Sequence, residues 1–412
     1  MRITLLGKLV IFILVAGFSV GGYKWWRQQQ NTRQVPPLNS NSATNDGRGT
    51  GTTTANAADS GDSTPSNASA NQIEFVITAA KKDWVGEQVD RFNAQNGGKW
   101  KIVTKPIPSR EAMHAILDGK EQPVLWSPGS PIWPQRLSEA YAPGHDNQTI
   151  VDLADPTGYR VFLRSPLVFL TTRKKAQFLR PLLGGTKPWQ SLREISLGKI
   201  KTPWGGFRFS HADPITSSSG MMTLGLIMYD YAQRTGQSGT MSRLATSKEF
   251  FAYLKEMDKS LVYDKPAVGG TTKLTNAFLE DTSRYDVITA YESAALEAAS
   301  KDSDLAVIYP NPTSVSEHAL SLLSASWVSQ DQRAGALEFM KFLGGRESLQ
   351  AGLKYKFRPA QASSTLSLNS ELEKFSVQGF QQNYTSTDLP PYEALNAVAF
   401  RWKKEIANAR QF

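Results

Sequence analysis

Residues 209–226, FSHADPITSSSGMMTLGL, contain the pattern on which the fold prediction depends. The stretch is typical of a strand end, a turn at Asp213-Pro214, a hydroxyl-rich run over 216–220 and an apolar helix that begins near Met221. Serine and threonine before an apolar run cap a helix, because their oxygens accept hydrogen bonds from the first-turn amides. This run holds more hydroxyls than one cap uses. The surplus hydroxyls and free amides favour a second role, binding a ligand, most readily an anion or a polyol.

Upstream of this stretch, short apolar runs of strand type alternate with amphipathic segments. The runs are 73–77 (IEFVI), 100–104 (WKIVT) and 123–126 (PVLW), with helical spacing over 82–95 and a helix capped by Ser109. Strands that alternate with helices predict an α/β fold with a mainly parallel sheet. In such sheets ligands bind beyond the carboxyl ends of the strands. The polar loops that emerge there are 78–80, 108–110 and 127–130.

Downstream, a long extended run over 161–171 (VFLRSPLVFLT) is predicted to cross from one lobe to another. A strand over 286–291 (DVITAY) runs into Glu292 and a helix, and the same alternation continues to Pro359. The sequence of residues 391–408 predicts a terminal helix with a basic surface.

Composition excludes several classes of function. Lysine and arginine exceed aspartate and glutamate by 46 − 37 = +9 in 412 residues, without a long basic run that carries aromatics, so nucleic acid binding is not predicted. The chain has no cysteine, which excludes disulfides, thiolate metal sites, cysteine nucleophiles and a lipid-anchoring cysteine. Four histidines lie far apart in sequence, and no metal site or cofactor is predicted.

Residues 1–30 are typical of an export signal. Arg2 and Lys8 precede an apolar run over residues 9–22, and Trp25 and Trp26 suit a membrane interface. No Ala-x-Ala cleavage site follows, which favours an uncleaved signal anchor over a cleaved signal peptide. Residues 31–71 are rich in Asn, Ser, Thr and Gly and predict a disordered linker. The rest of the chain is therefore expected outside the cytoplasm, tethered to the membrane.

An enzyme is not predicted, and no catalytic residue is assigned. The sequence contains no Gly-x-Ser-x-Gly elbow, no supported Ser-x-x-Lys motif and no glycine-rich phosphate loop that ends in lysine. Nothing identifies an acid that could orient His211 beside the serine run.

The order of these pieces resembles the type II periplasmic solute-binding proteins, the receptors of ABC importers. The similarity rests on FVITAAKKDW, HADPITSSSG, DVITAYES and the run from Trp327 to Ala360, in which two helices precede a Phe-Arg-Pro ending. It is greatest for the molybdate and sulfate branch and for binding-protein domains associated with von Willebrand A modules.

The resemblance implies two α/β lobes that close on a ligand in the cleft between them. Lobe 1 is expected over 72–165 plus 318–365 and lobe 2 over 166–317, with a C-terminal helical extension over 366–412. The expected partners are a small molecule or anion, the membrane through the N-terminal segment, and an ABC permease or another membrane protein. The ligand contacts that it implies are Thr78, Ala79, Ser109, Arg110, Ser127, Ser130, Thr216, Ser217, Ser218, Tyr291 and Glu292.

Several of these residues also have structural interpretations. Tyr291 can end a strand against the core, Glu292 can lie at the positive start of a helix, and Arg110 can be a solvated helix residue. The function expected is capture of a small ligand, with an oxyanion as one candidate, for an importer. The alternative is a membrane-anchored sensory, adhesion or scaffold module with the same fold.

Overall fold

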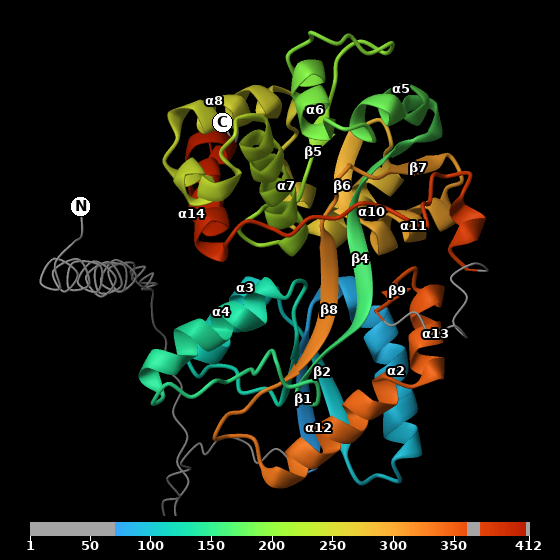
Figure 1. Cartoon of the computed structure of the whole chain (residues 1–412). Coiled ribbons are helices and arrows are strands. Elements are labelled where there is room, and N and C mark those ends of the chain that lie inside the picture. The colour runs from blue at the N-terminus through green and yellow to red at the C-terminus, as the bar shows by residue number, and fades with distance from the viewer. Residues whose placement is uncertain (1–70, 361–370, 409–412) are drawn as a thin grey trace, which may run out of the picture. The chain divides into compact units, whose positions relative to one another are not determined.

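The computed structural model describes residues 71–360 and 371–408, which form a mixed α/β fold around nine strands (Figure 1). The hydrogen-bonded order is β2-β1-β3-β8-β4-β6-β5, and β7 and β9 both pair with β4. The strands are β1 (Gln72–Ile77), β2 (Lys101–Pro106), β3 (Leu125–Ser127), β4 (Tyr159–Thr172), β5 (Phe209–Ser210), β6 (Val287–Tyr291), β7 (Leu305–Ile308), β8 (Val315–Leu322) and β9 (Arg358–Pro359).

The helices mostly follow the strands that the sequence predicts them to follow. They are α2 (Lys82–Gln95), α3 (Ser109–Leu117), α4 (Ile132–Tyr141), α5 (Arg173–Leu183), α6 (Pro188–Ser196), α7 (Ser218–Arg234), α8 (Lys248–Met257), α9 (Lys265–Val268), α10 (Thr271–Glu280), α11 (Glu292–Lys301), α12 (Gln330–Leu343), α13 (Arg346–Lys354) and α14 (Tyr392–Trp402). Short 3₁₀ segments include η1 (Ala79–Lys81) and η3 (Ser238–Ala245), and a π-helical turn, η6 (Lys403–Ala407), follows α14.

Strand β4 belongs to both lobes. Its first part pairs with β8 and β9 in the sheet of the first lobe, and its last residues pair with β6 and β7 in the sheet of the second. The predicted crossing is therefore confirmed. The prediction of a mainly parallel sheet is wrong: β1, β2 and β3 are parallel, as are β5 and β6, whereas every pairing of β4 and β8 is antiparallel. The antiparallel pairing fits a chain that passes from the first lobe to the second along β4 and returns along β8.

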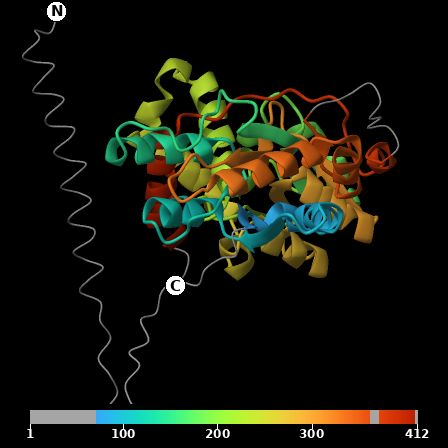
Figure 2. The same ribbon diagram turned by 90° about the horizontal axis from the view of Figure 1, so that it is seen from below.

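Helices cover both faces of each sheet because the strands bury side chains on both faces. Along β4, Leu167 and Phe169 pack in one core with α5–α8, and Val168 and Leu170 pack in another with α10 and α11. In the first lobe, Val76 of β1 packs in one core with α3 and α4. The adjacent Phe75 and Ile77 pack in another core with α2, α12 and α13. Figures 1 and 2 show α3 and α4 on one side of these strands and α2 and α13 on the other.

Helix α7 begins at Ser218, three residues before the start that its apolar pattern predicts. The preceding turn is closed by Asp213, whose carbonyl oxygen accepts hydrogen bonds from the amides of Thr216 and Ser217. The helix then passes so close to the segment that follows β5 that a Cβ at Gly220 would lie 2.1 Å from the carbonyl oxygen of Ala212. Only glycine fits this approach, which is what brings the serine run to the edge of the sheet.

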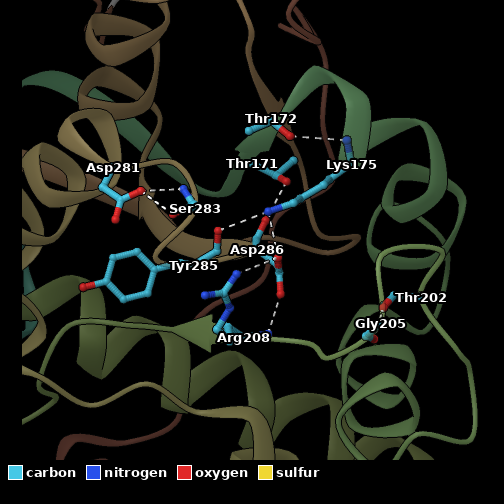
Figure 3. Close-up of polar contacts among 10 residues, drawn as sticks. All are labelled: Thr171, Thr172, Lys175, Thr202, Gly205, Arg208, Asp281, Ser283, Tyr285 and Asp286. Carbon is cyan, nitrogen blue, oxygen red and sulfur yellow. Dashed lines mark hydrogen bonds and ion pairs between the residues drawn. The ribbon is translucent and has the colours of Figure 1, made fainter.

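A buried carboxylate holds the other end of the second-lobe strands together (Figure 3). Asp286, just before β6, is fully buried and lies 2.7 Å from the ammonium of Lys175 on α5. Its other oxygen accepts a hydrogen bond from the backbone amide of Arg208, just before β5. Thr171 of β4 donates its hydroxyl to the backbone carbonyl of Asp286. The cluster joins β4, β5, β6 and α5 far from the serine run.

A second buried ion pair attaches the C-terminal segment. Arg358 of β9 donates to both carboxylate oxygens of Glu292, each at 2.7 Å, and to the backbone carbonyls of Gln381 and Gln382. Burial alone would lower the pKa of Arg358, but its hydrogen bonds and ion pair with Glu292 raise it above the ordinary value. Tyr309 donates its hydroxyl to the same carboxylate.

Beyond this pair, residues 381–391 cross the strands between the lobes before α14 packs on the second lobe (Figure 1). Thr313 exchanges backbone hydrogen bonds with Thr385 and Thr387, and Trp402 donates its indole N–H to buried Asp258. The C-terminal helix thus packs on the protein itself.

The predicted export signal, and all but the last residue of the predicted linker, lie outside the described residues. Within residues 71–360 and 371–408, no helix combines the length and the apolar character needed to cross a membrane.

Replacing Gly220 with alanine should lower the free energy of unfolding by about 3 kcal/mol, because the added methyl collides with backbone that cannot move independently. At Gly86 in α2 an added Cβ would meet no atom within 4 Å, so Gly86→Ala is the matched control. It should raise stability by about 0.5–1 kcal/mol, since alanine is the better helix former. Urea denaturation of both variants measures the difference. Equal effects would contradict the close approach of α7.

Glu292→Gln should destabilise the protein by about 3–5 kcal/mol, because it leaves the guanidinium of Arg358 buried without a counter-charge. The control is Glu371→Gln, which breaks an exposed pair with Lys374 and should change stability by less than about 1 kcal/mol. Chemical denaturation at neutral pH compares the two variants. If they behave alike, the Glu292 pair does not have the structural role described here.

Candidate functional site

A cavity of about 270 Å³ lies where loops of the two lobes meet. The first lobe lines it with residues 78–80, 106–109 and 129, and the second lobe with 216–218, 269–273 and 291. The predicted contacts Thr78, Ala79, Ser109, Thr216, Ser217, Ser218 and Tyr291 are thus brought together from separate segments of both lobes. The carboxyl ends of β1 and β6 both open onto it, as expected for an α/β sheet.

Three helices begin at this cavity: α3 at Ser109, α7 at Ser218 and α10 at Thr271. Their N-cap residues, Pro108, Ser217 and Gly270, make no side-chain hydrogen bond to the first helical turn. Each N-terminus carries a partial positive charge and amides without a helical acceptor. The wall contains no aspartate or glutamate, and its one charged residue is Lys273. This arrangement favours a ligand that is negatively charged or rich in hydrogen-bond acceptors.

Hydroxyl groups join two of these helix starts. The Ser217 hydroxyl lies 3.1 Å from that of Ser219 and 3.3 Å from that of Thr271, and Ser219 and Thr271 also hydrogen-bond to each other. The sequence pattern favours Ser217 as the cap of α7, but its hydroxyl makes no hydrogen bond to the first turn of that helix. It ties α7 to α10 instead, so that both N-termini face the same cavity.

The lobes touch directly beside the cavity at Gly129. The indole N–H of Trp133 in the first lobe donates to the Ser218 hydroxyl of the second at 2.9 Å. A Cβ at Gly129 would lie 3.0 Å from that hydroxyl oxygen and 3.3 Å from the Tyr291 oxygen. The Gly129 peptide is also fixed by two hydroxyls, since its amide donates to Ser109 and its carbonyl accepts from Ser316. Ser109, predicted to cap α3, thus orients this loop instead.

Tyr291 is fully buried at this contact, and its hydroxyl hydrogen-bonds to Ser218 and Ser316. Burial raises the pKa of Tyr291 above the ordinary tyrosine value, so the phenol stays protonated and neutral at physiological pH. It can act there as a hydrogen-bond donor.

Four predicted contacts lie away from this cavity. Ser127 is buried, accepts from the ammonium of Lys81 and donates to the carbonyl of Ala319. Ser130 lines a different cavity, of about 640 Å³, that the C-terminal segment helps to enclose. Gly129 lies between these two serines in the loop and is the residue that lines the 270 Å³ cavity. Ser127 contacts Lys81 instead, and Ser130 lines the larger cavity.

Arg110 and Glu292, the two charged residues of the predicted set, are engaged by other protein groups. Arg110 donates to the carbonyl of Ile215 at 2.7 Å and to the Tyr392 hydroxyl at 3.3 Å, and it lies over the Trp133 ring. It therefore links the first lobe to the second and to the C-terminal helix. Glu292 is held by Arg358, as described above, at the buried start of α11.

Sequence reasoning missed residues 269–273. Gly270 adopts φ = 89°, a left-handed conformation that favours glycine, and this turn places the first amides of α10 at the cavity. The signal was present, because GGTT before an apolar helix resembles the serine run of α7. Among the residues that the structure describes, no group of three or more histidine, aspartate or glutamate side chains could hold a metal ion.

Comparisons with known proteins agree with this fold. Solved structures with the same fold include the sulfate-binding protein SubI from Mycobacterium tuberculosis H37Rv (15% identity, TM-score 0.53, covering 77% of this chain and 94% of that one). Another is AfuA from Actinobacillus pleuropneumoniae with fructose-6-phosphate bound (14% identity, TM-score 0.53, covering 82% of this chain and 98% of that one). A third is the MalE domain from Bdellovibrio bacteriovorus bound to maltotriose (13% identity, TM-score 0.55, covering 82% of this chain and 95% of that one). These proteins share the two-lobed fold.

No curated protein sequence matches the chain. The family model of the bacterial extracellular solute-binding proteins matches residues 87–374, more than half of the chain. The family and the structural neighbours are binding proteins rather than enzymes. With its two α/β lobes and the cavity between them, the chain belongs to the bacterial extracellular solute-binding protein family.

Proposed function

We propose that this protein captures a small oxyanion, or a small molecule bearing one, in the 270 Å³ cavity and delivers it to an ABC-type importer. The observation that carries the proposal is the convergence of three helix N-termini without side-chain caps on a wall that has no carboxylate. Amides and hydroxyls can surround an anion without a paired side-chain cation, because the helix termini supply partial positive charge.

Two of the structural neighbours support an anionic ligand through what they bind. SubI is described as binding sulfate and AfuA carries a phosphorylated sugar, whereas the MalE domain carries the neutral maltotriose. Eight of the seventeen residues that line the wall described here carry hydroxyls, and its one aromatic ring is that of Tyr291, so the wall offers an anion more hydrogen-bond donors than it offers a sugar stacking rings.

The proposal includes the location and organisation of the protein. The family is extracellular, which agrees with an export signal over residues 1–30, and we propose that this segment tethers the protein to the membrane. Lobe 1 then comprises 72–165 plus 318–365, and lobe 2 comprises 166–317. Closure of the lobes around the ligand presents a surface that a permease recognises.

The test is thermal unfolding of the purified full-length chain with sulfate, molybdate, phosphate, fructose-6-phosphate and maltotriose. An anion at a hundred times its dissociation constant should stabilise the folded state by about 2.7 kcal/mol. Ser217→Ala should weaken that anion by about tenfold or more, because it removes a donor to a charged group. The matched control is Ser130→Ala. Because Ser130 lines the other cavity, this variant should bind the anion with wild-type affinity.

Stabilisation by maltotriose alone would contradict an oxyanion ligand while leaving a solute-binding role intact. If no compound stabilises the protein, the importer role loses its support from this panel. The alternative, a membrane-anchored sensory, adhesion or scaffold module of the same fold, would then be preferred.

A further inference from the structure

Lys81 is a buried cation without a buried counter-charge. Its side chain is among the largest that are fully buried, and its ammonium donates to the Ser127 carbonyl at 3.0 Å, the Ser127 hydroxyl at 2.7 Å and the Pro128 carbonyl at 2.7 Å. These three neutral oxygens use all three of its donors. Within the part of the chain that the structure describes, no carboxylate forms an ion pair with it. Such an arrangement fixes the position of the ammonium but leaves its charge uncompensated.

An uncompensated cation is unfavourable inside a protein, because burial removes its hydration. Burial accordingly lowers the pKa of Lys81 well below the ordinary lysine value. The neighbouring His318 of β8 is also fully buried, and burial together with the charge of Lys81 lowers its pKa well below the ordinary histidine value. Two adjacent basic groups therefore both disfavour positive charge.

The ammonium lies directly behind the first-lobe wall of the cavity. Lys81 immediately follows residues 78–80, which line it, and its acceptor Pro128 immediately precedes Gly129, which also lines it. Lys81 thus ties together two of the loops that the first lobe contributes. By contrast, Lys273 on the second-lobe wall is exposed, where water screens its charge.

We infer that Lys81 supplies the counter-charge for the bound anion from behind the wall and so determines the charge selectivity of the site. This inference rests on the proposed function. The anion does not need to touch the ammonium, since charges interact across a water-poor interior at longer range than in water. Binding of the anion favours the protonated form of Lys81, so that ligand and proton are taken up together.

Other charged groups surround Lys81. A cavity of about 490 Å³ on its other side brings near it Lys82 and Asp83 of α2, Glu297 and Lys301 of α11, and Lys354 and Tyr355 at the end of α13. Asp83 is exposed and pairs with Lys82, Glu297 pairs with Lys301, and Lys354 pairs with Glu87, so no carboxylate of this group compensates Lys81. The adjacent Lys82 has a largely exposed side chain and provides a matched control for the loss of one positive charge.

The experiment is calorimetric titration of the full-length protein with sulfate and with molybdate between pH 6 and 10, where neither anion changes its charge. Each titration is repeated in buffers of different ionisation enthalpy, which reveals proton uptake. Wild-type affinity should fall as pH rises, by up to about tenfold per pH unit, once the pH exceeds the pKa of unliganded Lys81. Proton uptake on binding should appear over the same range.

Lys81→Met keeps the length of the side chain and removes the charge. It should weaken the anion by roughly tenfold or more at pH 7 and abolish both the pH dependence and the proton uptake. Lys82→Met should retain the wild-type profile. The wild-type titration does not depend on the stability of any variant, so it tests the inference even if Lys81→Met folds poorly.

The possible failures are distinguishable. If neither anion, nor phosphate or fructose-6-phosphate titrated in the same way, binds the wild-type protein at any pH, the proposed oxyanion function fails, and the inference with it. If the anion binds but its affinity is independent of pH without proton uptake, or if the two methionine variants bind equally well, the inference alone is overturned. Lys81 would then be a structural tie between two loops.

Discussion

The shared strand β4 is the constraint on which the rest of the structure depends. Because the same fourteen residues, Tyr159–Thr172, hydrogen-bond to β8 and β9 in one lobe and to β6 and β7 in the other, the lobes share one continuous backbone ladder. Separating them would require breaking buried backbone hydrogen bonds, whereas bending the strand does not. The loops at the strand ends are therefore held opposite one another, and the cavity forms where they meet.

Two kinds of buried charge can be distinguished among the residues that the structure describes, and the difference separates structural roles from a proposed functional one. Asp286 and Glu292 are each paired with a cation, and both pairs join segments that are distant in sequence. Lys81 has hydrogen bonds but no opposite charge. A protein can give a buried charge a full counter-charge when only stability matters, so a buried charge beside a cavity that has hydrogen bonds but no counter-charge favours an anionic ligand.

Much of the fold was predictable because it follows from local patterns. The apolar runs at Ile73 and Val287 and the amphipathic spacing of α2 and α12 indicate the correct elements from side-chain periodicity alone. Helix α4 was missed, since prolines at 131 and 134 conceal a helical spacing of Trp133, Leu137 and Tyr141. Prolines in the first turn are compatible with a helix, because those amides have no helical acceptor.

The sequence by itself determined the alternation of strands and helices, the absence of cysteine chemistry and the hydroxyl-rich loops at the strand ends, because composition and periodicity are local properties. Only the tertiary structure decided which hydroxyls face the cavity. Ser217 and Ser127 look alike in sequence, but one lines the wall and the other is held by Lys81. That distinction depends on which distant groups reach each side chain once β4 has brought the two lobes together, and no local pattern records it.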